Sequence, residues 1–316
     1  MDANLLHWKS QGQSFLGRLK IWFDLLDPTL LISSDAEIHK AHTALGSGEK
    51  TSEKETTTAA TLALSSVHAD TGQVLPFIFR PPALFPISAP IIYAAFLPHK
   101  SVKSALLSQF LLQSYFTGFN YANRNISSEK QNKLSLKQMF LNVGTVSYAT
   151  CAGAFPQIII NRLRVRDASV LHFCRTVLPI PLAAFLAFFS LITVRSEEAE
   201  DGITVFDSEG NAVGRSKAAG EKAVRETALS RAALIGTTAA GPSLIVSLLQ
   251  RSSFFRSRRL LLAPLRPFSL VFLVGLAIPA SLSLFPQLGT VKQEVLEEEL
   301  RAAAALDGHL YYHRGL

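Results

Sequence analysis

Charged residues are scarce in this sequence, and their absence is concentrated in long runs. Asp, Glu, Lys and Arg make up 17% of the 316 residues, and 48% of the residues are hydrophobic. An average soluble domain has charges at about a quarter of its positions. Six runs contain no charged residue at all: 81–98, 104–123, 138–161, 176–194, 232–250 and 268–291. Because no acid lies inside them, we expect no proton-coupled pump with a carboxylate in mid-membrane.

Other chemical signatures are missing as well. The two cysteines, Cys151 and Cys174, cannot by themselves hold an iron–sulfur cluster, which ordinarily takes four protein ligands, and we expect both to be small buried side chains. The sequence has no Walker loop, dinucleotide fingerprint or nucleophile elbow. It also has no cleavable signal at the N-terminus, where an early Asp replaces the apolar core. We therefore expect neither an enzyme nor a bound cofactor.

The charge-free runs predict an all-α polytopic membrane protein. A helix needs about 17 to 25 residues to cross the hydrocarbon core, and the last five runs are long enough on this criterion. The first run holds five prolines, so we expect a re-entrant or interfacial segment there. The alternative, a soluble protein, would have to bury six helices that are apolar on every side.

The basic loops predict the orientation of these spans. Residues 99–103, 162–175 and 251–266 carry an excess of Lys and Arg, which places them together on one side of the membrane by the positive-inside rule. Five spans then put the N-terminal region, residues 1–80, on that same side. The connection at 195–231 and the tail at 292–316 would lie opposite. The net charge of +7 follows from this topology and indicates no nucleic-acid partner.

Three regions outside the spans have patterns of their own. Residues 15–26 predict an amphipathic helix, either at the membrane interface or packed on the protein. Residues 46–61, rich in Ser, Thr, Lys and Glu, predict a flexible linker. Within 195–231 we expect a β-hairpin, with Gly210 and Asn211 at positive φ, followed by a helix that Ser216 caps.

The run at 104–123 carries an unusual stripe of uncharged polar side chains. On a helix these side chains fall within about a third of the circumference. The stripe consists of Gln109, Gln113, Thr117, Asn120 and Asn123, with Arg124 at its end. In a dry environment each unsatisfied amide costs a few kcal/mol, so the stripe needs partners. It either lines a transport path, with Arg124 at the mouth to meet a carboxylate, or forms hydrogen bonds that hold the helices together.

A second polar motif, HADTGQ, occupies residues 68–73. The residue types at His68, Asp70 and Thr71, just before a glycine, favour a hydrogen-bonded turn. His68 and Asp70 alone are too few ligands for a metal ion, so no metal site is expected.

Four strings in this order resemble the sideroflexin family over nearly the whole chain. They are VHADTGQVLP, the polar stripe, GITVFDSEGNAVGRSKAAGEKAVRETALSR and SLSLFPQ. The resemblance implies a protein of the mitochondrial inner membrane with about five spans, so that the basic loops and residues 1–80 would face the matrix. It also implies transport of serine and other neutral amino acids. The stripe departs from the family's pattern at Leu112 and Phe116, where amides are usual, and this puts an inherited serine specificity in question.

Three further strings, DLLDPTLLISS, AVRETALSR and YYHRGL, most resemble one vertebrate branch of that family. The branch is associated with assembly of respiratory complex I and with mitochondrial iron homeostasis. The first hypothesis is therefore a passive carrier of a small neutral amino acid or related metabolite, surrounded by inner-membrane lipids. The alternative is a non-transporting assembly factor whose partners are the complex I assembly proteins.

Overall fold

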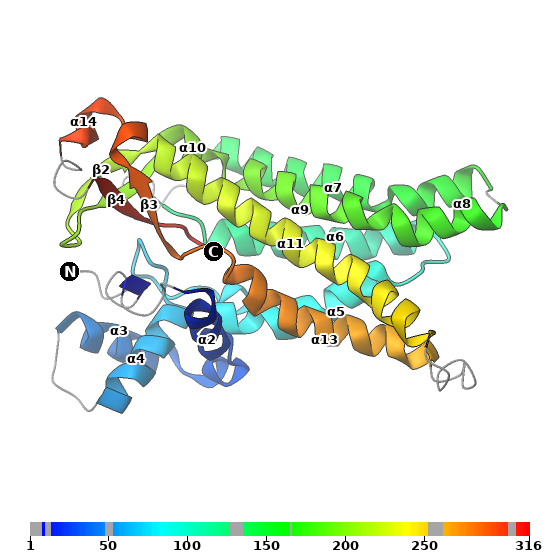
Figure 1. The fold of residues 1–316 in the computed structure, drawn as a ribbon, viewed down its shortest axis with the longest axis horizontal. Coiled ribbons are helices and arrows are strands. Elements are labelled where there is room, and N and C mark those ends of the chain that lie inside the picture. Colours follow the sequence, from blue (N-terminus) through cyan, green and yellow to red (C-terminus); the bar gives the residue numbers. More distant parts are fainter. Residues whose placement is uncertain are drawn as a thin grey trace.

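The computed structural model describes residues 8–9, 14–47, 53–126, 135–164, 166–251, 262–302 and 308–316. It is a long helical bundle with a small sheet at one end and a cluster of N-terminal helices beside the sheet (Figure 1). The bundle helices are α5 (Leu84–Phe96), α6 (Val102–Ala122), α7 (Leu136–Arg162), α9 (Pro179–Val194), α11 (Lys217–Leu249) and α13 (Leu262–Leu282). Helix α11 packs between α9 and α13, α7 packs between α6 and α9, and α5 packs against α6 and α13.

Three helical segments are long and apolar enough to cross a membrane. They are Leu136–Arg162, Ala168–Val194 and Lys217–Leu249. The second of these joins α8 (Ala168–His172), the wide turn η5 (Phe173–Val177) and α9. The apolar parts of α5 and α13, Pro81–Phe96 and Pro267–Leu282, are shorter. The helical membrane class is confirmed, whereas the predicted count of five spans is not.

The Pro-rich segment is part of the bundle. Residues Leu84–Phe96 form one helix that continues through Pro90, and Leu84 and Ile92 are fully buried. The carbonyl of Phe79, just before α5, accepts a hydrogen bond from Asn123 at the end of α6, while His99, after α5, bonds Ser104 at the start of α6. Helix α5 therefore runs antiparallel along α6 inside the bundle. It belongs to the shorter apolar helices, so the re-entrant or interfacial segment stays a prediction.

The N-terminal region packs at the sheet end of the bundle (Figure 1). Its helices are α2 (Phe15–Leu25), α3 (Asp35–Ser47) and α4 (Glu53–Ser66). The Arg18 side chain donates to the Ser283 carbonyl at 2.9 Å, and Lys9 donates to the Ser208 carbonyl at 2.9 Å. Both acceptors lie at the sheet end of the bundle. The region therefore sits beside the hairpin, and the expectation that it shares a side with the basic loops is wrong.

The two alternatives for the amphipathic helix each describe part of α2. Trp22 and Leu26 are buried in the main core, whereas Phe15, Leu16 and Phe23 are exposed. The expected linker is in part helical, because α4 begins at Glu53, and its residues 48–52 lie outside the described part of the chain. Cys174 is buried as expected, but Cys151 is exposed on α7 because it faces away from the bundle.

The predicted hairpin is present, and the tail completes it as a four-stranded sheet. Strands β1 (Ile203–Phe206), β2 (Ala212–Ser216), β3 (Leu288–Lys292) and β4 (His309–His313) are antiparallel in the order β2-β1-β4-β3. Gly210 has a φ of 84°, as expected. Asn211 does not have positive φ, because its backbone instead donates to the Asp207 carboxylate at 2.8 Å. The predicted run at 268–291 ends as β3, since α13 stops at Leu282, before Pro286.

Helix α11 is the longest element and connects the sheet to the body of the bundle. Ser216 caps it as predicted, with its hydroxyl accepting from the Ala219 backbone N–H at 3.1 Å. The helix does not stop at Arg231 but continues to Leu249. It crosses α10 (Ser196–Asp201) at Gly220, where an added Cβ would collide with the Glu198 carbonyl oxygen.

This crossing predicts the effect of two glycine substitutions. Gly220→Ala should lower the free energy of unfolding by about 1–3 kcal/mol, because α10 and α11 must separate. The control is Gly144→Ala on α7, where an added Cβ meets no atom within 4 Å. Because Ala favours a helix more than Gly does, the free energy of unfolding of this variant should be unchanged or about 1 kcal/mol higher. Thermal unfolding of both variants in detergent tests the pair, and equal melting temperatures would contradict the crossing.

Candidate functional site

A cavity of about 800 Å³ lies between α6, α7, α9 and α11. Its wall on α6 reaches from Ala105 to Asn120, roughly 22 Å along the helix axis. Four residues of the predicted stripe line it, namely Gln109, Gln113, Thr117 and Asn120, together with Leu112 and Phe116. The two positions at which this sequence departs from the family's pattern therefore face the same cavity as the polar stripe.

Local backbone features bring polar groups to this cavity. Gly153 on α7 allows Gln109 to lie directly against the helix, since any Cβ there would collide with the Gln109 side chain. In η5, the Leu178 N–H bonds the Phe173 carbonyl at 2.9 Å, five residues back. Pro179 follows and has no N–H to continue the ordinary ladder. This wide turn directs Cys174, Arg175 and Thr176 to the loop end of the cavity, the end near residues 97–99.

The stripe divides into two kinds of residue. Gln109 and Gln113 make no hydrogen bond to any residue that the structure describes, and the buried Thr117 hydroxyl has no partner there either. Asn123, by contrast, donates to the carbonyls of Phe79 and Phe119 at 3.0 and 2.9 Å. Asn123 therefore has the structural role, with hydrogen bonds that hold segments together. Gln109, Gln113 and Thr117 instead present unpartnered polar groups to the cavity.

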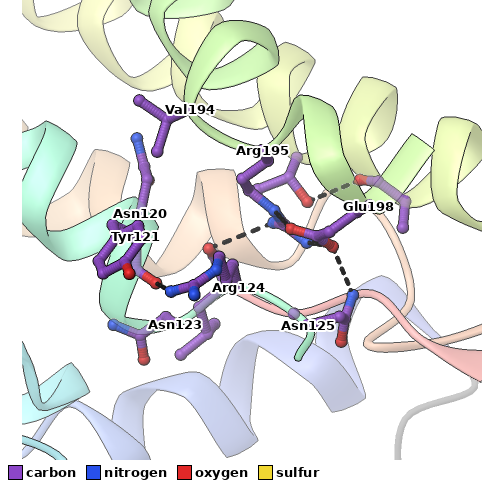
Figure 2. A network of polar contacts seen from close by, with 12 residues as sticks. Asn120, Tyr121, Asn123, Arg124, Asn125, Val194, Arg195 and Glu198 are labelled. Atoms are coloured by element: carbon purple, nitrogen blue, oxygen red, sulfur yellow. Dashed lines mark hydrogen bonds and ion pairs between the residues drawn. The ribbon is translucent and has the colours of Figure 1, made fainter. Parts of the chain in front are cut away.

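Arg124 is not at the mouth of the cavity. Its guanidinium lies over the ring of Tyr121, three residues earlier in the chain, at 3.7 Å from the ring centroid. It also donates to the Tyr121 carbonyl at 2.7 Å. Arg124 is absent from the lining residues. The expectation that it meets a substrate carboxylate at the mouth is wrong, because the side chain folds back on its own helix end (Figure 2).

The buried arginine in the cavity wall is Arg231, which the sequence patterns did not single out. It is 1% exposed and lines the cavity. Its Nε donates to the Asn120 side-chain oxygen at 3.3 Å, and its guanidinium lies 5.4 Å from the Phe119 ring centroid. Neither Nη1 nor Nη2 has a hydrogen-bond partner among the described residues. The available signal was its position, directly before the charge-free run at 232–250.

Beyond Asn120 a network of buried polar contacts fills the sheet end of the bundle. Arg195 and Glu198 form a buried ion pair, and Asn125 donates to Glu198 at 2.8 Å (Figure 2). Arg195 also donates to the Arg314 carbonyl at 2.8 Å, and the Leu316 N–H donates to the Asn123 carbonyl at 3.1 Å. The C-terminal residues are thus bound between the end of α6 and the start of α10.

The motif at 68–73 is the hydrogen-bonded turn that the sequence predicts. The His68 ring accepts from the Asp70 N–H at Nδ1, so its Nε2 carries the hydrogen that binds the Arg124 carbonyl at 2.8 Å. The Asp70 carboxylate accepts from the Ile126 N–H at 2.8 Å, and the Thr71 hydroxyl accepts from the Gln73 N–H at 3.3 Å. The turn therefore caps the end of α6. No three His, Cys, Asp or Glu side chains of the described ranges form a metal-binding group.

Burial lowers the pKa of His68, although the charge of Asp70 opposes the shift. Neutral His68 is thus favoured in the folded protein, and the unfolded chain takes up the proton first as the pH falls below about 6.5. The melting temperature should fall between pH 7.5 and 5.5, and less steeply in His68→Gln, which keeps a donor for Arg124. His39→Gln, at an exposed histidine of α3, should keep the natural slope. Equal slopes in all three proteins would refute this prediction.

Comparison with known proteins gives relatives that cover the whole chain. The chain is 51% identical to Sideroflexin-4 of Danio rerio over 100% of both chains. It is 32% identical to Sideroflexin-4 of Homo sapiens over 100% of this chain and 93% of the relative. Human Sideroflexin-5 is 28% identical, over 97% of this chain and 91% of the relative. No solved structure gives a significant match.

The family model described as "Sideroflexins" matches residues 4–316. Together with the three apolar helices, this match indicates a membrane protein with a transporter-like role in general. The chain belongs to the sideroflexin family.

Proposed function

We propose that this protein is a passive carrier of a small neutral amino acid or a related metabolite in the mitochondrial inner membrane. The observation that carries the proposal is the cavity of about 800 Å³ with unpartnered polar groups inside a bundle poor in charge. Small-molecule sites in proteins have volumes of about 300 to 1,000 Å³ and few, precisely placed polar groups. We propose no enzymatic activity for it.

The unpartnered groups support a solute rather than a purely structural role. A buried amide or hydroxyl without a hydrogen bond costs about 1–3 kcal/mol in a protein. Gln113 and Thr117 lie four residues apart on one face of α6, so both can contact one molecule in the cavity. A solute with hydroxyl, ammonium or carboxylate groups satisfies them, and water satisfies them when the solute leaves.

Two lining residues and one buried control residue test the carrier function. Gln113→Leu and Asn120→Leu should each reduce uptake of labelled L-serine into proteoliposomes by about tenfold or more, because each removes a polar contact in a dry site. The control is Gln138→Leu on α7. Gln138 is buried but lies outside the lining, and it donates to the Val194 carbonyl at 2.8 Å.

The control should lower the melting temperature and leave the KM for uptake unchanged. Gln113→Leu should raise the KM for uptake and leave the melting temperature unchanged, whereas Asn120→Leu should also lower the melting temperature because Asn120 is the acceptor of the buried Arg231. If Gln113→Leu lost stability with an unchanged KM, the polar stripe would be structural and the carrier proposal would lose its main support.

A second function is supported by two apolar side chains in the cavity wall. Leu112 is 4% exposed, and Phe116 packs against the main core. These apolar side chains make the cavity narrower and less polar, which favours a role without transport. We propose as the alternative that the protein assists assembly of respiratory complex I and mitochondrial iron homeostasis through protein partners.

Restoring polar side chains distinguishes the two functions. The double variant Leu112→Asn with Phe116→Asn should raise L-serine uptake several-fold if the apolar pair limits the path. Leu111→Asn, at an exposed neighbour on α6, is the control and should not raise uptake. Uptake in the double variant alone supports the assembly role for the natural sequence, whereas saturable uptake by the natural protein supports the carrier.

A further inference from the structure

Three fully buried arginines lie near the sheet end of the bundle, and they differ in how many hydrogen-bond acceptors each one has. Arg195 pairs with Glu198 and donates to two C-terminal carbonyls. Arg314 donates to the carbonyls of Leu282 and Phe285 at 2.9 and 3.1 Å. Arg231 has one neutral acceptor, Asn120, at 3.3 Å. Like Arg314, it forms no ion pair with a described carboxylate. It has the fewest acceptors of the three, because Nη1 and Nη2 both lack a partner among the described residues, whereas Arg314 lacks one only at Nε.

The surroundings of Arg231 make that lack costly. On α6 it faces Asn120, Phe119 and the phenol of Tyr115, all of which are neutral at physiological pH. Arg195 and Arg314 are close enough to repel it electrostatically. A buried charge without a paired opposite charge is strongly unfavourable, and its remaining N–H groups need acceptors. An anion in the cavity supplies both the opposite charge and the hydrogen-bond acceptors.

The rest of the cavity has the same electrostatic sign. Arg175, His99 and His172 line its loop end, and no Asp or Glu is present among its lining residues in the described part of the chain. Arg231 and Arg175 therefore give the cavity a positive charge that no described lining acid balances, which favours anions over simple cations. A solute that bears an amino group without an acid group has no carboxylate here to pair with.

We infer that Arg231 is the carboxylate-binding residue of this cavity, and that it selects solutes that carry a carboxylate. This inference rests on the proposed carrier function and names the solute class for the same site. The planar guanidinium presents two parallel N–H groups, which match a carboxylate in a bidentate pair. Nη1 and Nη2 are the two nitrogens that no described residue occupies. The amide and hydroxyl of Gln113 and Thr117 then receive the remainder of the solute.

Three related probes test this selection on the natural protein. L-Serine carries both an ammonium and a carboxylate, 3-hydroxypropanoate lacks the ammonium, and ethanolamine lacks the carboxylate. In proteoliposomes, 3-hydroxypropanoate should inhibit uptake of labelled L-serine, and ethanolamine should require at least a tenfold higher concentration. Equal inhibition by ethanolamine would overturn the inference while leaving the carrier function intact.

Variants at the site then assign the selection to Arg231. Arg231→Gln should raise the KM for L-serine at least tenfold, and Arg231→Lys should have an intermediate effect because charge remains but the planar fork is lost. Arg225→Gln, at an exposed arginine of the same helix, should behave as the natural protein. An unchanged KM in Arg231→Gln would refute the assignment.

A third variant separates binding from a structural role. Asn120→Asp places a carboxylate beside Arg231, so it should raise the melting temperature and weaken L-serine uptake at the same time. Because Asn120 itself lines the cavity, the deciding measurement is selectivity: a purely structural arginine would give greater stability with an unchanged preference for 3-hydroxypropanoate over ethanolamine, whereas a carboxylate-binding arginine would lose that preference. This variant also tests the inference if Arg231→Gln fails to fold.

Ligand-dependent stability distinguishes failure of the inference from failure of the carrier proposal. In detergent, L-serine and 3-hydroxypropanoate should raise the melting temperature of the natural protein, ethanolamine should not, and Arg231→Lys should reduce the shift. If no probe is transported but this pattern is found, the carrier proposal fails and the carboxylate site stands. If neither transport nor stabilisation occurs with any probe, both proposals are refuted.

Discussion

The buried ion pair between Arg195 and Glu198 connects more of this molecule than any other contact that the structure describes. It lies where α9 ends and α10 begins, and it binds Asn125 after α6 and the carbonyls of the C-terminal residues. Separating such a pair leaves a buried charge without compensation, at a cost of about 3–5 kcal/mol. The end of α6, the sheet and the C-terminus therefore hold one arrangement at this end of the bundle.

That arrangement also determines where the cavity stops. The C-terminal residues occupy the space beyond Asn120, with the Leu316 N–H on the Asn123 carbonyl. The pKa of Arg314 falls to about 10 through burial, so this side chain still carries its charge at neutral pH and keeps its carbonyl acceptors. Both Nη atoms of Arg314 have acceptors and Arg195 has a carboxylate partner, whereas both Nη atoms of Arg231 lack a partner among the described residues and this side chain lines the cavity. The chemistry of the site follows from this unequal sharing of acceptors among three arginines.

The polar stripe illustrates why residue type alone does not fix a role. Gln113 and Asn123 are both amides on one helix face, yet one faces the cavity and the other binds the Phe79 carbonyl. The difference arises because the short helical turn Phe77–Phe79, before α5, lies against the last turns of α6, while the middle turns of α6 line the cavity. Leu112 and Phe116 reduce the polarity of that lining, which is the one feature that argues against transport of a strongly hydrated solute.

The sequence by itself determined the helical membrane class, the hairpin at 203–216, the Ser216 cap and the turn at 68–73. Each depends on interactions within a few residues: helical period, glycine at positive φ, and short side-chain bonds to the backbone. Only the tertiary structure decided the course of α5, the side of the N-terminal region, the pairing of β3 with β4 and the burial of Arg231. These depend on which segments far apart in the chain become neighbours, and charge-free runs carry no information about that choice.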